Sequence, residues 1–410
     1  AGKPIPLIAE TGGINAMIVD SSALAEQVVR DVIASAFDSA GQRCSALRLL
    51  CIQDDVYDRT LGLLKGALSQ LAIGSTTKLS NDIGPVITDE ALEGIEKHIA
   101  EMEAAGHKVT RVKMPAGTEN GSFVAPAIIE LDSTTELTRE VFGPVLHVTR
   151  FSRHDLVPLV HEINMSGYGL TFGLHTRLDG TVDQVARVIE AGNIYINRNQ
   201  IGAIVGSQPF GGHRLSGTGP KAGGPLYLGR LVSQPPALPM AMSDPAVHQF
   251  AQWLRMRGEI AASDAARAYA DQGGLGYREV LPGPVGERNT YELRKRGHIL
   301  IRPKTKAGFQ QQLSAVLATG NVAVIENMDW AADLPPELHG RVEALGHHPV
   351  AGALVEGGED DVRKALAEFA ERDGPLVLTQ SATEADCASD TPAYCLNWLL
   401  EEVSISVDTT

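Results

Sequence analysis

The sequence predicts an α/β fold, because short apolar runs typical of strands alternate with longer segments whose apolar residues recur at helical spacing. Strand–helix–strand repeats of this kind are typical of a parallel sheet covered by helices. They form two sets, separated by a proline-rich stretch at residues 234–239 that should interrupt regular structure. A chain of 410 residues is long for a single domain, so at least two are expected.

The first set of repeats covers residues 14–197. Its expected strands are residues 14–19, 47–52, 123–131 and 194–197, and its expected helices are residues 24–37, 92–105, 156–164 and 182–191. Ser21 or Ser22 can cap the first helix, and Gly41 can end it. Cys44 then lies in the loop between this helix and the next strand, a position where reactive side chains are commonly held.

The second set begins near residue 298. Its expected strands are residues 298–302, 321–325, 350–355 and 376–379, and its expected helices are residues 307–319 and 360–372. Between the two sets, residues 247–257 and 263–270 look like surface helices, and residues 281–286 like a loop. We find no glycine-rich dinucleotide fingerprint in either set. His347 and His348 are interpreted as surface residues, since no carboxylate or cysteine stands at ligand spacing.

Composition excludes several classes of function. The formal net charge of −15 argues against nucleic acid or an anionic membrane as the main partner. The 4 cysteines form no CxxC pair, so neither a zinc site nor a disulfide scaffold is indicated, and a reducing cytoplasm is expected. No run of about 18 apolar residues predicts a membrane-spanning helix. The first residues carry no signal-peptide pattern and read like the middle of a longer polypeptide.

Cys44 and Glu10 are the residues whose surroundings suggest chemistry. A thiolate can add to an aldehyde carbonyl to give a thiohemiacetal, and loss of hydride to a nicotinamide ring then leaves a thioester. A carboxylate base can activate the water that releases the acid. A lone cysteine is more often a small buried hydrophobe, and that reading is kept for Cys51, Cys387 and Cys395.

Four sequence elements resemble those of the aldehyde dehydrogenase superfamily, in the family's order and at near-family spacings. They are Glu10-Thr11-Gly12-Gly13, Gly41-Gln42-Arg43-Cys44, Glu140-Val141-Phe142-Gly143-Pro144 and Pro209-Phe210-Gly211-Gly212. The resemblance covers residues 1 to about 232. It implies an open α/β catalytic domain at residues 1–235, incomplete at its N-terminus, with the NAD-binding half of the family's fold missing before Glu10.

The resemblance also implies roles for individual residues. Cys44 would be the nucleophile, with its backbone N–H as half of an oxyanion hole, and Glu10 the hydrolytic base. The cofactor would be NAD, with Glu140 binding the nicotinamide ribose and Phe142 packing beside the ring. No metal is implied.

The substrate is narrowed by Ser45 directly after the nucleophile, by the loop at residues 197–203 and by the stretch at residues 215–225. These are similar to the glutamate-semialdehyde branch of the superfamily, and more closely to the dehydrogenase part of the proline utilization A family. By that resemblance Ser45 and the backbone N–H groups of Gly202 and Ala203 hold the substrate's α-carboxylate, and Phe210 packs on its methylene stem. A glycine-containing loop can aim successive N–H groups at an anion, although an ordinary tight turn remains the alternative.

The second half resembles the long variety of the same family. The resemblance implies a linker and helical segment at residues 236–296 and a non-catalytic, Rossmann-like accessory domain at residues 297–410. A covalently linked proline dehydrogenase domain, which would hold FAD outside this chain, is the expected partner. A homo-oligomer is left open, and the location is expected to be cytoplasmic, or peripheral at the inner membrane for the full-length protein.

The leading interpretation is therefore an NAD-dependent L-glutamate γ-semialdehyde dehydrogenase. Its substrate forms from 1-pyrroline-5-carboxylate, its product is glutamate, and the reaction is the second step of proline catabolism in a bifunctional enzyme. The chain by itself is expected to be inactive. Two alternatives stay open, namely a non-catalytic assembly module of a larger enzyme and a dehydrogenase for another aldehyde.

Overall fold

The computed structural model describes residue 5 and residues 7–232, 242–346 and 349–410. The proline-rich stretch at residues 234–239 and the pair His347 and His348 lie outside the described residues. Contacts divide the chain into two compact units, each built from separate segments. Unit 1 comprises Ala1–Glu10, Gly217–Val280 and Thr290–Val403, and unit 2 comprises Thr11–Ser216, Leu281–Asn289 and Ser404–Thr410. The domain limits expected from sequence, near residues 235 and 297, stay a prediction.

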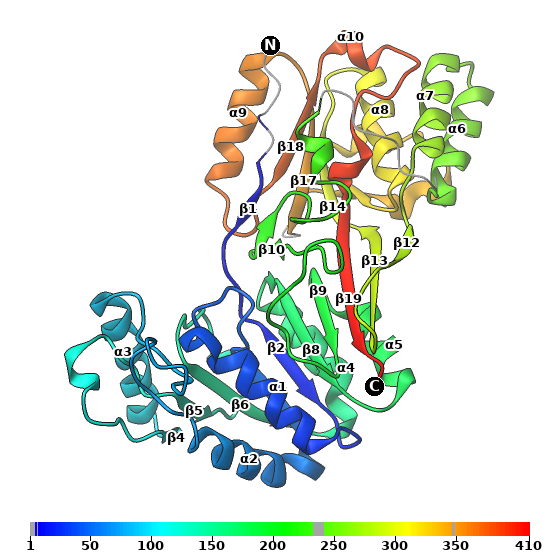
Figure 1. Cartoon of the computed structure of the whole chain (residues 1–410). Helices are drawn as coiled ribbons and strands as arrows, with labels where there is room; N and C mark the ends of the chain where they lie inside the picture. The colour runs from blue at the N-terminus through cyan, green and yellow to red at the C-terminus, as the bar shows by residue number, and fades with distance from the viewer. Residues whose placement is uncertain (1–4, 6, 233–241, 347–348) are drawn as a thin grey trace. The chain divides into compact units, whose positions relative to one another are not determined.

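Unit 2 is built on a largely parallel sheet (Figure 1). Its neighbouring strands follow the order β19-β9-β8-β2-β3-β6-β5-β4, in which only β4 runs antiparallel to its neighbour β5. The strands are β2 (Ala16–Val19), β3 (Leu49–Gln53), β4 (Lys108–Arg111), β5 (Ala127–Glu130), β6 (Val145–Phe151), β8 (Thr171–His175), β9 (Asn193–Ile196) and the end of β19 (Leu400–Asp408). Every residue of β2, β3, β8 and β9 is buried, as expected for central strands of a covered parallel sheet.

Five helices accompany this sheet. They are α1 (Ala25–Phe37), α2 (Asp54–Leu68), α3 (Asp89–Ala104), α4 (Leu156–Met165) and α5 (Asp179–Val188). Helices α1 and α2 contact each other and β6, and α4 packs on α5. The two-stranded pair of β7 (Tyr168–Gly169) and β10 (His213–Arg214) completes the unit.

The expected serine cap of the first helix is wrong. Helix α1 begins at Ala25, and Leu24 precedes it without a side-chain cap. The Ser22 hydroxyl instead donates to Asp20 Oδ1 at 2.5 Å, and the Ser22 N–H donates to the same oxygen at 2.7 Å. Because a nearby carboxylate competes for the serine, the local cap signal did not place the helix start.

Unit 1 contains a second sheet, five-stranded and wholly parallel, in the order β16-β15-β14-β17-β18. The strands are β14 (His298–Arg302), β15 (Val322–Ile325), β16 (Val342–Ala344), β17 (Val350–Glu356) and β18 (Leu378–Ala382). Helix α8 (Lys306–Ala318) is buried along residues 308–318, and α9 (Glu359–Ala370) packs on β17. The second predicted α/β set is thereby confirmed as a parallel sheet with helices.

The two helices expected on the surface each bury one face. Helix α6 (Pro245–Met256) inserts Val247, Phe250 and Leu254 into the core, and it packs against α7 (Ile260–Asp271) and α8. Other elements of this unit are β1 (Ala9–Glu10), which pairs antiparallel with β11 (Gly217–Thr218), then β12 (Arg278–Leu281) and α10 (Glu384–Cys387). The chain passes between the two units along β13 (Glu287–Lys295) and β19.

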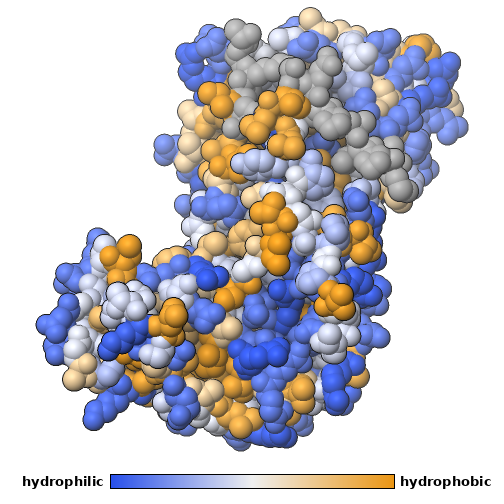
Figure 2. Space-filling view, viewed as in Figure 1, coloured by the Kyte–Doolittle hydropathy of each residue, from blue (hydrophilic) through white to orange (hydrophobic). Residues whose placement is uncertain are grey.

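Hydrophobic residues on the face drawn in Figure 2 lie in separate groups among hydrophilic ones. Among the described residues, no helix is both long enough and apolar enough to cross a membrane.

Candidate functional site

Cys44 sits just after a left-handed turn. A short 3-10 segment, Asp38–Gly41, follows α1, and Ser39, Ala40 and Gly41 have φ values of 58°, 55° and 65°. Two successive non-glycine residues with positive φ are costly, on the order of 1–2 kcal/mol each. A side chain at position 41 is also excluded, because its Cβ would lie 2.1 Å from the Gly143 carbonyl oxygen. The turn leaves the Cys44 side chain exposed.

The buried side chain of Asn15 holds the backbone on both sides of Ser45. Its Nδ2 donates to the carbonyl oxygens of Cys44 at 2.6 Å and of Ala46 at 2.9 Å, while its Oδ1 accepts from the Thr171 N–H at 3.1 Å. Asn15 is 1% exposed, and its bonds to Ala46 and Thr171 are shielded from water. The Asn15 side chain, directly before β2, therefore fixes the backbone that carries the exposed Cys44 thiol.

Arg48 connects the turn before Cys44 to the predicted cofactor residues. Its buried guanidinium donates to the carbonyl oxygens of Arg43 and Gly143, each at 3.1 Å, and lies 3.5 Å from Glu140 Oε1. The same group lies over the Phe142 ring, 5.2 Å from the centroid. The structure thus brings Glu140 and Phe142 together around one buried cation, next to the residue that precedes Cys44.

Glu140 remains partly accessible while it is held in place. Its side chain is 17% exposed, and its Oε2 accepts from the Gly13 N–H at 3.3 Å. Burial raises the pKa of Glu140, and the nearby Arg48 charge and the Gly13 bond oppose that rise. The Phe142 ring is 45% exposed. An oriented carboxylate beside an accessible aromatic ring fits the hydroxyls and the flat face of a nicotinamide riboside.

The loop predicted to bind the substrate's carboxylate, residues 197–203, contacts Ser45, the residue that follows Cys44. Gln200 Nε2 donates to the Ser45 carbonyl oxygen at 3.4 Å, and Ser45 is 6% exposed. Gly202 is exposed, with φ of 74°, and Ala203 is half-buried. Phe210, farther along the chain, is half-buried. Ser45, Gly202, Ala203 and Phe210 all belong to unit 2, as does Cys44, and their role in binding the substrate stays a prediction.

Glu10 belongs to unit 1. It lies on β1, opposite Gly217 of β11, and its side chain is exposed. The register with β11 fixes the direction of the Glu10 side chain through backbone pairing. Its role as the hydrolytic base stays a prediction.

The remaining candidates for chemistry are the other cysteines, possible metal ligands and a cavity. Cys51 is wholly buried in β3 and Cys387 is 2% exposed, as expected for small hydrophobes. The same interpretation is wrong for Cys395, which is exposed, because hydrogen bonds between its backbone and the Gln380 side chain hold it at the surface. Across the described ranges, no group of three or more acidic, histidine or cysteine side chains could hold a metal ion. A cavity of about 450 Å³ is lined by Lys65, Arg111 and Lys113 among others and contains no predicted site residue. Lys65 and Arg111 are already paired with Glu130 and Glu96.

Sequence reasoning missed Asn15, Arg48 and Gln200. Arg48 carried a usable signal, since a charged residue inside an apolar run such as residues 47–52 must be paired if it is buried. Asn15 and Gln200 carried none, because their partners are backbone groups that only the fold brings near.

Comparison with known proteins shows which family this chain is similar to. Residues 1–233 match the sequence profile of the aldehyde dehydrogenase family. The "Bifunctional protein PutA" of Rhizobium meliloti is 53% identical over 424 aligned residues, covering 100% of this chain and 34% of that protein. The "1-pyrroline-5-carboxylate dehydrogenase 1" of Halalkalibacterium halodurans is 37% identical over 54% of this chain and 43% of its own length.

A solved structure extends the likeness to nearly the whole chain. Proline utilization A from Corynebacterium freiburgense matches with a TM-score of 0.72 and 25% identity, over 98% of this chain and 39% of that one. The predicted α/β fold class is thereby confirmed as an aldehyde dehydrogenase fold. The chain spans about a third of the length of the PutA proteins that it matches.

Proposed function

Because this chain belongs to the aldehyde dehydrogenase family, we propose that it carries the nucleophile and substrate site of an NAD-dependent L-glutamate γ-semialdehyde dehydrogenase. The observation that carries the proposal is the arrangement around Cys44. An exposed thiol on a strained turn adjoins a glycine-containing loop on one side, through Gln200 and Ser45, and the Arg48–Glu140 pair on the other. The names of the relatives, which include 1-pyrroline-5-carboxylate dehydrogenase, support the same substrate.

The residues of this chain divide the reaction between them. The Cys44 thiolate adds to the aldehyde carbon, and its own backbone N–H stabilises the oxyanion that forms. Loss of the aldehyde hydrogen as hydride leaves a thioester on Cys44. Glu10 removes a proton from water, which attacks the thioester, expels the thiolate and yields glutamate.

NAD, when bound, supplies the acceptor for that hydride. Glu140 would accept hydrogen bonds from the nicotinamide ribose, and Phe142 would pack against the ring. The structure fits this assignment, since the Glu140 carboxylate is oriented by Arg48 and by the Gly13 N–H yet keeps part of its surface accessible. Ser45 and the N–H groups of Gly202 and Ala203 would hold the substrate's α-carboxylate, with Phe210 on the methylene stem.

The activity belongs, in this proposal, to a longer bifunctional protein that also oxidises proline with FAD in a separate domain. The similarity to PutA along the whole chain supports it. Glu140 and Phe142 would contact only the nicotinamide end of NAD, so the 410-residue chain alone should bind NAD too weakly to work. We place the protein in a reducing cytoplasm, where an exposed nucleophilic thiol stays unoxidised.

The direct test is NADH formation by the full-length protein supplied with NAD and 1-pyrroline-5-carboxylate. Turnover that is lost in Cys44→Ala is expected. No NADH from this substrate or from other aldehydes would favour the non-catalytic module, and equal rates with aldehydes that lack an α-carboxylate would favour another substrate. Calorimetry of the 410-residue chain with NAD should show no binding in the micromolar range.

A further inference from the structure

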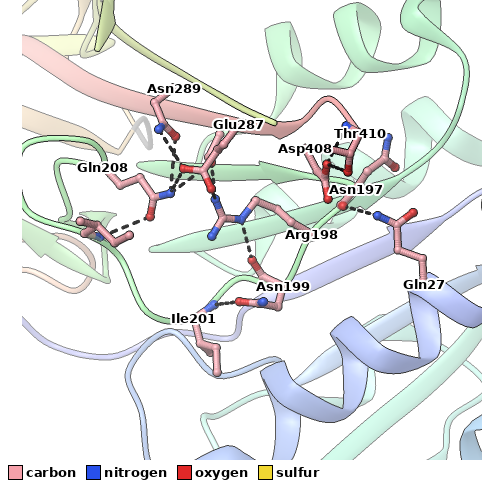
Figure 3. Close-up of polar contacts among 12 residues, drawn as sticks. Gln27, Asn197, Arg198, Asn199, Ile201, Gln208, Glu287, Asn289, Asp408 and Thr410 are labelled. Atoms are coloured by element: carbon pink, nitrogen blue, oxygen red, sulfur yellow. Dashed lines mark hydrogen bonds and ion pairs between the residues drawn. The ribbon is translucent and has the colours of Figure 1, made fainter. Parts of the chain in front are cut away.

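We propose that Glu287 is a positioning residue that ties together the two ends of the loop at residues 199–207, and thereby sets specificity for aldehydes that carry a carboxylate. This inference rests on the proposed function of the same loop. Glu287 lies on the segment Leu281–Asn289, far along the chain from the loop it contacts (Figure 3).

Arg198 joins the start of the loop to Glu287. Its Nη1 donates to Glu287 Oε2 and, at 2.7 Å, to the Ser406 hydroxyl, while its Nε donates to the Asn199 carbonyl oxygen at 3.3 Å. The side chains of Arg198 and Glu287 are each 14% exposed. Ser406 stands opposite Tyr195 in the parallel pairing of β19 with β9, so the sheet itself places this hydroxyl where the loop begins.

Gln208 joins the end of the loop to the same carboxylate. Its Nε2 donates to Glu287 Oε1 at 2.6 Å and to the Ser406 hydroxyl at 3.3 Å. Its Oε1 accepts from the Ile204 N–H at 3.3 Å, inside the loop. Gln208 is 3% exposed. One side chain therefore reaches both the loop backbone and the bridging carboxylate.

Glu287 uses its two oxygens for the two ends. Oε2 faces Arg198, and Oε1 accepts from Gln208 and also from Asn289 Nδ2 at 2.8 Å. These charge-assisted bonds are largely buried, so neither competing water nor dissolved salt weakens them much.

The loop is packed at its start, where Gln200 and Ile201 are buried, but its middle has little packing of its own. Gly202 is exposed, and Ile204 and Val205 are 51% and 84% exposed. Because the middle of the loop has few core contacts, the positions of the Gly202 and Ala203 N–H groups depend on how well the segments on either side are fixed. Binding an anion with backbone N–H groups requires that they converge before the ligand arrives. Loosening the ends should therefore weaken carboxylate binding and leave the chemistry at Cys44 largely unchanged.

The test compares two aldehydes in the full-length protein. In Glu287→Gln, the new amide must point a donor at either Arg198 or Gln208, which are themselves donors. KM for the semialdehyde should rise about tenfold, the loss of one charge-assisted bond, with kcat changed less than about threefold. The kcat/KM for propanal, which has no carboxylate, should change less than about threefold. Ser406→Ala, which removes the shared hydroxyl, should give a smaller shift in the same direction.

A double variant that restores the hydrogen bonds distinguishes a positioning role of Glu287 from a general loss of folding. In the double variant Glu287→Gln with Gln208→Glu, the amide oxygen of residue 287 accepts from Arg198 and its amide nitrogen donates to the carboxylate of residue 208. That carboxylate also accepts from the Ile204 N–H, and a rotated Asn289 amide presents its oxygen to residue 287. KM should return to within about threefold of the parent. Arg288→Gln, on the exposed neighbouring side chain, should leave both substrates unaffected.

Equal losses for semialdehyde and propanal, an unchanged KM in both Glu287→Gln and Ser406→Ala, or no rescue by the double exchange would overturn the inference. The proposed function fails in a different way, namely when the unaltered protein does not oxidise the semialdehyde.

Discussion

The guanidinium of Arg48 and the carboxylate of Glu140 form an ion pair of 3.5 Å in which the arginine side chain is fully buried. The same guanidinium holds the carbonyl oxygens of Arg43 and Gly143. One residue thus supports both the turn that ends in Cys44 and the carboxylate assigned to the cofactor. Burial lowers the pKa of Arg48, and the negative charge of Glu140 opposes this shift. The attraction between the two charges therefore offsets part of the cost of burying the guanidinium.

Arg48→Met should lower the free energy of unfolding by about 3 kcal/mol, because the carbonyl groups of Arg43 and Gly143 and the Glu140 carboxylate lose their partner. Denaturant unfolding of the 410-residue chain measures it. Arg187→Met is the matched control, since Arg187 and its partner Asp183 are 79% and 73% exposed and should contribute less than about 0.5 kcal/mol. A loss no larger than that of the control would contradict the bridging role.

Cys44→Ala should abolish aldehyde oxidation in the full-length protein while NAD binding stays nearly intact. Without the thiol no thiohemiacetal forms, and no hydride can leave. Steady-state NADH formation and NAD calorimetry measure the two effects. Cys51→Ala, which removes a buried thiol in β3, serves as the control and should cost only modest stability. Cys44→Ala turnover within about tenfold of the parent would rule out the assignment.

Glu10→Gln should slow thioester hydrolysis more than thioester formation, because only hydrolysis needs a base to activate water. Rapid mixing should show a burst of NADH followed by a slow phase. If both phases slow equally, Glu10 serves the structure of β1 or the acylation step instead.

Gly202→Val and Ser45→Ala should each raise KM for the semialdehyde by about tenfold and affect aliphatic aldehydes much less. Valine strains a backbone with φ of 74°, although the space around position 202 is open, so the effect comes from the shifted N–H groups. The two classes of aldehyde are compared by kcat/KM. Parallel losses in both would remove the carboxylate-binding role from this loop.

Acid should destabilise the chain through His147. Burial, together with the neighbouring His98 at 2.8 Å, lowers the pKa of His147 to about 3. Between the usual histidine pKa of about 6.5 and that value, the unfolded chain binds a proton that the folded chain does not. The free energy of unfolding therefore falls on acidification through this window, by up to about 1.4 kcal/mol per pH unit for this one group.

His147→Asn, whose amide nitrogen takes the place of Nδ1 as a donor for the Arg48 carbonyl oxygen, should flatten the dependence measured by denaturant unfolding between about pH 6.5 and 5. An unchanged slope would show that His147 is not the responsible group.

The sequence by itself determined the alternation of strands and helices and the place of many of them, although it did not predict α2, β6, β8 or β19. Apolar periodicity is a local property, and it placed β14 at residues 298–302 and the helix α8 within one residue of its observed limits. It also placed Cys44 in a loop and Cys51 in a buried strand. The predicted helix cap was wrong at Ser22, because its hydroxyl donates to Asp20 and does not cap α1.

The tertiary structure decided how the candidate site is held. The left-handed turn at residues 39–41 packs so closely against Gly143 that a side chain at position 41 would clash, and no local propensity predicts that contact. The pairs Arg48–Glu140 and Arg198–Glu287 join residues that are remote in the chain. Side-chain periodicity shows which residues are buried, but the partner of a buried charge depends on which strands become neighbours, and only the folded sheet fixes that.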